Sequence, residues 1–163
     1  MKTLLIVWHS RTGGARQMAE AAARGAGGEP QVRLRMAGAA EAQPDDLMAA
    51  DGYLFVCPEN LASMSGAMKE FFDRCYYPCL ERLNGRPYAA MICAGSDGTS
   101  AARQLARIAL GWRLKPIAEP LIVNVAAQTP EAILAEKRLD TAQLAPCETL
   151  GAALAAGLAM GVF

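Results

Sequence analysis

The sequence has no excess of charge of either sign, only one histidine and no long apolar run. Lys plus Arg and Asp plus Glu number 16 each over 163 residues, so no basic patch for nucleic acid is expected. The first apolar run ends at His9, short of the roughly 7–15 apolar residues of a signal peptide. The tail from Leu150 to Phe163 is too short to span a bilayer. With one histidine, no second Cys/His pair completes a zinc site, and no metal is expected.

The cysteines, five in all, do not suit a disulfide framework. Their odd number and apolar surroundings predict a protein of the reducing cytoplasm. Cys75 and Cys79, four positions apart, would share one helical face; we interpret them as semi-buried thiols, with a redox pair as the open alternative. The apolar content of 53% is typical of a globular protein, and the length suits a single domain over residues 1–163.

Short apolar segments alternate with helical segments along the chain. This pattern predicts an α/β fold in which helices cover both faces of a parallel sheet. The expected strand order is 2-1-3-4-5, with a ligand outside the carboxyl ends of strands one, three and four. Strands are expected at residues 4–8, 31–36, 53–57, 88–93 and 116–125 (interrupted at 119–120), and helices after residue 14, at 44–47, 65–74, 99–110 and 142–160.

The loop between the first strand and the first helix predicts an anion site. It brings backbone N–H groups, two hydroxyls and a helix N-terminus to one point, and the usual anion in this setting is a phosphate. Other phosphate loops are excluded: there is no Walker-type Lys-Ser/Thr pair, no G-x-G-x-x-G, and no Arg shortly after Cys57 or Cys93. A receiver-type acidic pair is also absent. The alternative that Ser10 and Thr12 only cap the helix stays open.

The Ser-x-Thr-Gly-x pattern of this loop resembles the phosphate loop of flavodoxin-like proteins, which bind the phosphate of FMN. The last hydroxyl of that family's pattern falls on Ala15, whose backbone N–H can still donate. Charged contacts from two arginines could offset the missing hydrogen bond. The resemblance implies phosphate contacts from Ser10, Arg11, Thr12, Gly13, Gly14, Ala15 and Arg16.

The segment from Cys57 to Arg74 resembles the P-x-x-x-G-x-M-S-x-x-M/L-K-x-F-x-D motif of flavodoxin-like quinone reductases and NAD(P)H-dependent FMN reductases. Only the glycine of the motif is changed, to Ala62. The Met and Phe residues that follow, Met68, Phe71 and Phe72, are interpreted as core. The resemblance implies a flavodoxin-like three-layer sandwich with a five-stranded parallel sheet, and contacts to the flavin ring from Pro58, Glu59, Asn60, Leu61, Ala62, Ser63 and Met64.

A third loop falls where this family places its second flavin-binding loop. Its small residues would let the backbone approach a planar ligand, although the same sequence is also an ordinary loop before a helix. The loop consists of Ala94, Gly95, Ser96, Asp97 and Gly98.

Flavodoxins that carry electrons resemble this chain in fold, but they are strongly acidic and stack aromatic side chains on both flavin faces. Neither predicted ring loop here contains an aromatic residue, unless Tyr76 or Tyr77 folds back over the site. We therefore expect an FMN-binding enzyme that oxidises NAD(P)H and reduces a small-molecule acceptor, a quinone or a flavin, with no side-chain nucleophile. A flavodoxin-type electron carrier and a non-catalytic FMN-binding protein remain the alternatives.

Two further features are interpreted structurally. His9, the lone histidine, is expected to be a hydrogen-bonding residue at a strand end. The closing helix carries no charge from Leu150 to Met160, whereas a surface helix normally has a polar stripe. That helix is expected either to be enclosed by its own fold or to be buried in a homo-oligomer.

Overall fold

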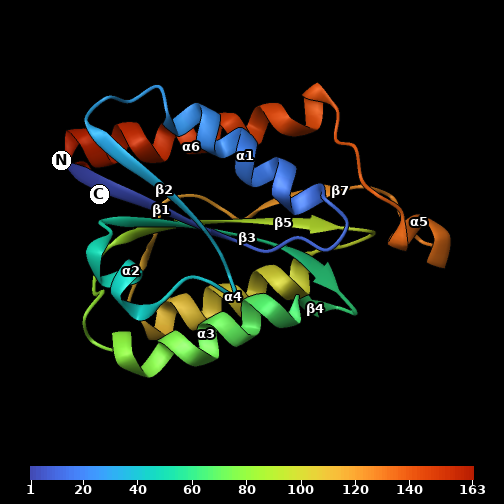
Figure 1. Ribbon diagram of the computed structural model, residues 1–163, viewed down its shortest axis with the longest axis horizontal. Helices are drawn as coiled ribbons and strands as arrows, with labels where there is room; N and C mark the ends of the chain where they lie inside the picture. Colours follow the sequence, from blue (N-terminus) through green and yellow to red (C-terminus); the bar gives the residue numbers. More distant parts are fainter.

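The computed structural model describes all residues 1–163 and contains a largely parallel β-sheet between two layers of helices (Figure 1). The register places Ile6 opposite Leu54 on one side and opposite Met36 on the other. The main path of the sheet runs β2-β1-β3-β5-β6. Its strands are β1 (Lys2–Trp8), β2 (Val32–Gly38), β3 (Gly52–Asn60), β5 (Pro87–Ala94) and β6 (Lys115–Pro116), with β4 (Ser63–Met64) antiparallel to β3 and β7 (Leu121–Asn124) parallel to β5.

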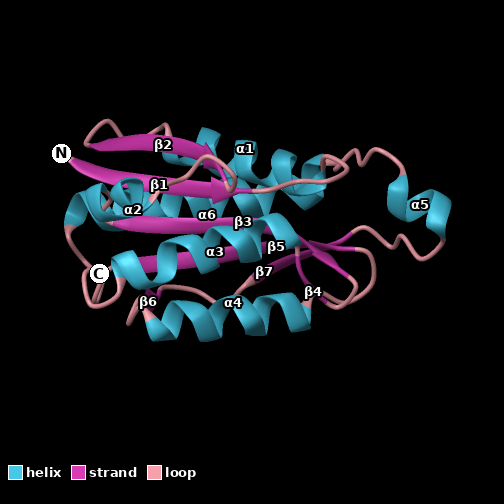
Figure 2. Cartoon of the chain, turned by 60° about the horizontal axis from the view of Figure 1, so that its bottom comes forward, coloured by secondary structure: helices cyan, strands magenta, loops and turns pink.

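Helices cover both faces of this sheet, as the alternating pattern predicts. Helices α1 (Gly14–Ala26) and α6 (Thr141–Met160) lie on one face, and α3 (Gly66–Cys79) and α4 (Thr99–Gly111) lie on the other (Figure 1). The short helix α2 (Pro44–Ala49) packs near α3. Helix α5 (Pro130–Leu134), which the sequence pattern did not predict, projects beyond the carboxyl ends of the strands (Figure 2).

The predicted number of five strands is wrong, because the sheet contains seven, and its main path is β2-β1-β3-β5-β6 in place of 2-1-3-4-5. The predicted fourth strand is β5 and the predicted fifth corresponds to β6 and β7, so their places relative to β3 are as expected. The chain after β3 turns back on itself and adds the short antiparallel strand β4. The expected fifth strand is divided into β6 and β7 on either side of Ala118-Glu119-Pro120. Pro120 has no N–H to donate to a neighbouring strand, which disfavours continuous pairing there. Helix α3 also extends past its predicted end at Arg74, because Pro78 lies only in its last turn.

The core is split by the sheet into two clusters. The cluster under α3 and α4 is aromatic: the ring centroids of Phe55 and Phe72 are 5.2 Å apart, and those of Phe72 and Trp112 are 5.6 Å apart. Met68, Phe71 and Phe72 are buried in this cluster, which confirms their assignment to the core. The cluster under α1 and α6 is built from aliphatic, alanine, methionine and cysteine side chains.

The small residues of α6 allow it to pack very closely on α1. A Cβ atom on Gly151 would collide with the backbone of Ala22, and one on Gly25 would collide with the backbone of Glu148. The uncharged run of α6 therefore has a partner within the fold, and the homo-oligomer stays a prediction. None of the helices combines the length and apolar character needed to cross a membrane.

Candidate functional site

Three loops meet where β1, β3 and β5 end, and contacts in the structure connect each to its neighbours. His9 N donates to Val56 O at 2.9 Å, which joins the first loop to β3. The Glu59 carboxylate accepts from Gly98 N at 2.9 Å, which joins the second loop to the third. The structure therefore brings the three predicted segments together at one edge of the sheet, as parallel strands require.

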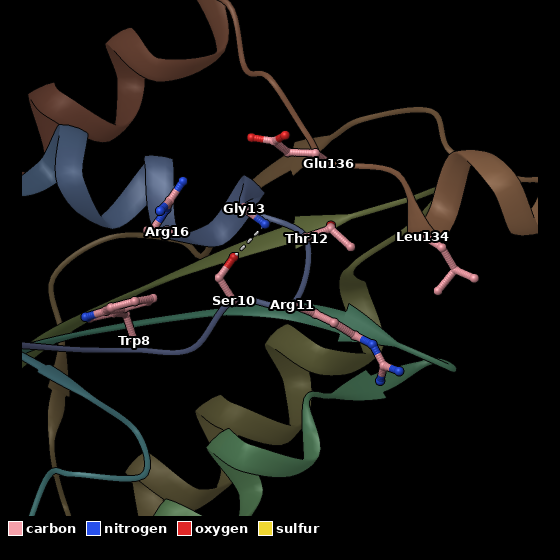
Figure 3. A pocket seen from close by; sticks show the side chains of 8 residues that line it. All are labelled: Trp8, Ser10, Arg11, Thr12, Gly13, Arg16, Leu134 and Glu136. Atoms are coloured by element: carbon pink, nitrogen blue, oxygen red, sulfur yellow. Dashed lines mark hydrogen bonds between the residues drawn. The ribbon is translucent and has the colours of Figure 1, made fainter.

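In the first loop, two hydroxyl groups accept hydrogen bonds from the protein and keep their own hydrogens free. Ser10 Oγ accepts from Gly13 N at 3.1 Å, the dashed line in Figure 3. Thr12 Oγ1 accepts from Lys137 Nζ at 3.4 Å. A hydroxyl can donate one hydrogen bond while accepting others, so both side chains can donate to an external anion. No side chain caps the N-terminus of α1, so capping does not explain Thr12.

The N-terminus of α1 is open to an anion. Its first helical hydrogen bond runs from Gln17 N to Gly13 O at 3.1 Å, and the N–H groups of Gly14, Ala15 and Arg16 have no acceptor within the protein. Gly14 and Ala15 are buried residues, and a buried N–H is normally paired. These N–H groups point in the direction in which a helix N-terminus stabilises negative charge.

The N-terminus of α4 is closed by carboxylates. Glu59 accepts hydrogen bonds from Gly98 N at 2.9 Å and from Ala101 N at 3.0 Å. Asp97 accepts from Thr99 N at 3.2 Å. Of the three helices that follow the loops, α4 carries its own anions, whereas α1 and α3 have no side-chain cap. At α1 the free N–H groups lie beside the hydroxyls of Ser10 and Thr12, which favours α1 as the phosphate site.

A cavity of about 420 Å³ lies over the first loop. Arg16 and Arg11 reach out on opposite sides of Ser10 (Figure 3). Arg16 is also paired with Glu20 at 3.8 Å, and both side chains are about half exposed. The sequence reasoning missed three of the lining residues, of which Leu134 and Glu136 come from the far end of the chain. The cavity is lined by Trp8, Ser10, Arg11, Thr12, Gly13, Arg16, Leu134 and Glu136.

The second loop is a tight hairpin between β3 and β4. Asn60 pairs with Ser63, and the two residues at the tip, Leu61 and Ala62, have φ values of 51° and 58°. Left-handed backbone costs a non-glycine residue roughly 1–2 kcal/mol, so the tip is strained at both positions. The side chain of Leu61 is fully exposed.

The side chains of Gln104 and Glu59 hold the hairpin in place, a role that the sequence does not predict for either. Gln104 Oε1 on α4 accepts from Met64 N at 2.9 Å and from Ser63 Oγ at 3.0 Å. The Glu59 carboxylate, expected to contact the ring, is engaged with the N-terminus of α4. The backbone of the hairpin, rather than the Glu59 side chain, is therefore what the loop offers to a ligand.

The small residues of the third loop are required by packing within the protein. A Cβ atom at Gly95 would lie 2.6 Å from Ala127 O, and one at Gly98 would lie 2.7 Å from Ile122 Cγ2. Asn124 Nδ2 donates to Ser96 O at 2.6 Å and fixes the loop against the end of β7. Gly98 also has a φ of 94°, which favours glycine.

His9 has the structural role expected of it. Its Nδ1 lies 2.8 Å from the Oγ of the fully buried Ser65 at the start of α3. Burial lowers the pKa of His9, and the positive charge of Arg11 lowers it further. The neutral imidazole is therefore the favoured form at this junction between the first loop and α3.

The thiols are buried and unpaired. Burial raises the pKa of Cys57 to about 12 and that of Cys75 to about 11. Cys75 and Cys79 lie buried in α3 and face the backbone oxygens of Ala42 and Pro44. A thiol reacts as its thiolate, so these environments disfavour a redox role for the pair.

No aromatic side chain from the end of α3 covers the loops. Tyr76 stacks on Trp112 with ring centroids 5.7 Å apart, and Tyr77 is exposed. Tyr76 lies ten residues beyond Gly66, about 15 Å along a helix that starts at the loops. The aromatic residue nearest the first loop in sequence, Trp8, instead lines its cavity.

The protein-family comparison matches residues 31–128 to the NADPH-dependent FMN reductase family. A flavodoxin of Aquifex aeolicus is 31% identical over 98 residues, which cover 60% of this chain and 53% of that protein. An NAD(P)H dehydrogenase (quinone) of Acidithiobacillus ferrooxidans is 35% identical over 94 residues, which cover 45% and 47% respectively. The chain spans about half the length of these curated relatives.

Solved structures show the same fold at low sequence identity. A flavodoxin from the domain Archaea superposes with a TM-score of 0.74 at 18% identity, over 96% of this chain and 98% of that one. A flavodoxin, WrbA-like protein from Agrobacterium tumefaciens gives a TM-score of 0.67 at 19% identity, over 99% of both chains. The flavodoxin-like fold is thus shared, whereas the residues of the site must be argued from this chain.

Proposed function

The chain belongs to the NADPH-dependent FMN reductase family, and we propose that it binds FMN at the three loops and oxidises NAD(P)H. The electron acceptor in this proposal is a small molecule, a quinone or a flavin. When bound, FMN supplies the redox chemistry, because its ring accepts a hydride and passes the electrons on. The protein supplies binding, orientation and electrostatics.

The open N-terminus of α1 is the observation that carries the proposal. It combines the free N–H groups of Gly14, Ala15 and Arg16 with the two hydroxyls of Ser10 and Thr12. Such a set of donors matches the oxygens of a phosphate group. The missing hydroxyl at Ala15 is compatible with this role, since its backbone N–H remains free.

The other two loops are suited to a planar, uncharged ring. The hairpin from Pro58 to Met64 is held by Gln104, and the loop from Ala94 to Gly98 is held by Glu59 and Asn124. Rigid backbone of this kind places donors and acceptors at fixed spacing. No aromatic side chain belongs to either loop. This favours a reductase in which one face of the bound flavin ring is open to a nicotinamide or a quinone.

The flavodoxin relative favours a second candidate function. In that case the chain would exchange electrons with a protein partner and would not oxidise NAD(P)H. The balanced charge of 16 basic and 16 acidic residues offers little electrostatic steering toward such a partner, so we favour the reductase.

The phosphate assignment is tested by titrating the apo-protein with FMN and with riboflavin, which lacks the phosphate. Replacing Thr12 by alanine removes one donor to a charged group, and we expect FMN affinity to fall by about 1.5–3 kcal/mol while riboflavin affinity is kept. T149A, at an exposed threonine of α6, is the matched control. Equal affinity of the unmodified protein for FMN and riboflavin would show that the phosphate is not recognised.

The reaction is tested by stopped-flow reduction of the FMN-loaded protein. We expect NADH or NADPH to bleach the flavin absorbance within seconds, followed by reoxidation by a quinone or free flavin. If neither nucleotide reduces the flavin while a ferredoxin-type protein does, the carrier is correct and the reductase is wrong.

A further inference from the structure

A segment from the far end of the chain is tied to the first loop. After β7 the chain leaves the sheet, forms α5 and returns toward the start of α1 (Figure 1). Lys137 N donates to Thr12 O at 2.8 Å, and Gln17 Nε2 donates to Lys137 O at 2.6 Å. Gln17 Oε1 also accepts from Leu139 N at 3.0 Å. The backbone of Lys137 is therefore fixed to a loop 125 positions earlier in the sequence.

The ammonium group of Lys137 is held by neutral oxygens alone. Its three N–H groups have three acceptors: Ala135 O at 2.6 Å, Ile133 O at 2.9 Å and Thr12 Oγ1 at 3.4 Å. Lys137 forms no salt bridge with a carboxylate, although its side chain is only partly exposed. Glu136 is the one carboxylate residue that lines the adjacent cavity, where Arg11 and Arg16 are also present. The carboxylates nearby are Glu136 and the Glu20 that pairs with Arg16, so with Lys137, Arg11 and Arg16 the balance of charge beside Thr12 is positive.

We propose that Lys137 is a positioning residue of the phosphate site and adds to the protein's preference for a phosphorylated flavin. The proposal rests on the function proposed above. Because all three N–H groups of the ammonium are in use, Lys137 acts through Thr12. Its hydrogen bond occupies a lone pair of Thr12 Oγ1, so the Thr12 hydrogen is directed to the anion. The unpaired charge adds a favourable electrostatic contribution that an uncharged ligand does not receive.

The experiment compares K137M with the unmodified protein in FMN and riboflavin titrations, followed by the quenching of flavin fluorescence. K137M keeps an unbranched apolar side chain and removes the charge. We expect its Kd for FMN to rise about tenfold, as for loss of one charge-assisted contact, with less than a twofold change for riboflavin. K137Q keeps an N–H donor without the charge, so its Kd for FMN should rise by less than that of K137M. K115M removes an exposed lysine from β6, far from the loops, and should leave both affinities unchanged.

Salt provides a readout that a purely structural role would not move. Exposed charge interactions are screened as ionic strength rises, so FMN affinity should fall with salt more steeply in the unmodified protein than in K137M. Riboflavin affinity should show no such difference between the two proteins.

The outcomes separate this proposal from the one on which it rests. If the unmodified protein prefers FMN to riboflavin and K137M keeps the full preference, Lys137 has no part in phosphate recognition and the inference is wrong. If K137M weakens FMN and riboflavin equally, the segment only supports the fold, and the inference is again overturned. If the unmodified protein itself shows no preference for FMN, the phosphate site fails as a whole.

Discussion

Replacing Glu59 by glutamine removes a charge that holds two loops of the site in place. The Glu59 carboxylate accepts hydrogen bonds from Gly98 N and Ala101 N at 2.9 and 3.0 Å. It thereby connects the end of β3 to the start of α4, and it places a negative charge at the N-terminus of that helix. Glutamine has nearly the same shape, but it offers only one acceptor atom and no charge.

The expected loss of stability follows from these contacts. A hydrogen bond to a charged group contributes about 1.5–3 kcal/mol, and a charge near a helix N-terminus contributes roughly 0.3–1 kcal/mol. These contributions overlap, and glutamine keeps one acceptor, so we expect E59Q to lower the free energy of unfolding by about 2 kcal/mol. With a urea dependence of about 2 kcal/mol/M, the midpoint of unfolding should fall by about 1 M.

Urea unfolding of the apo-protein measures this loss, and E119Q is the matched control. Glu119 is exposed and makes no salt bridge or side-chain hydrogen bond. E119Q should therefore change the free energy of unfolding by no more than about 0.5 kcal/mol. Because E59Q loosens the ring loops and not the α1 N-terminus, it should weaken FMN and riboflavin by similar factors. A midpoint for E59Q that matches the E119Q midpoint would show that the carboxylate does not stabilise the loops.

Two further predictions concern strain and titration. A62G should raise the free energy of unfolding by about 0.5–1 kcal/mol, because relief of the left-handed backbone exceeds the entropy cost of glycine. A153G, the same substitution at an exposed position of α6, should instead lower the free energy of unfolding. Burial lowers the pKa of His9 below its usual 6.5, so the unfolded state binds more protons near that pH. The contribution of His9 to the free energy of unfolding should therefore be fully present above about pH 6.5 and should be lost as the pH decreases through the lowered pKa. Urea unfolding at several pH values should show a smaller decrease of stability in H9N than in the unmodified protein.

The parts of the fold that could be predicted from the sequence are those set by local patterns. The apolar run from Leu4 to Trp8 forms β1, and the alanine-rich segment after Gly14 forms α1. Residues at the carboxyl ends of neighbouring parallel strands must meet, so the sequence predicts that the three loops lie together. The number of strands is not predicted correctly, because Pro120 divides the expected fifth strand and a two-residue hairpin adds β4.

The residues that organise the site could not be predicted in this way. Gln17 and Gln104 lie in amphipathic helices, where polar residues are usually solvated. The side chain of each instead forms a hydrogen bond with the backbone of a loop segment. Lys137 is fixed to Thr12 by a backbone hydrogen bond, which any residue except proline can donate and which leaves no mark in the sequence. The segment that forms α5 has no periodic apolar pattern, since that helix has no buried residue.

The N-termini of α1 and α4 differ in a way that gives the site its direction. A phosphate at α4 would meet the carboxylates of Glu59 and Asp97, whereas at α1 it meets free N–H groups beside an unpaired lysine. In the proposed function, the phosphate end of FMN and its ring end would therefore be held by separate contacts. If this separation is correct, K137M changes the preference for FMN over riboflavin without loosening the ring loops, and E59Q loosens the ring loops without changing that preference. The changes in the free energy of FMN binding caused by K137M and by E59Q should then add in the double variant to within about 0.5 kcal/mol, since independent sites add. A larger coupling energy would mean that the phosphate and the ring are recognised as one unit.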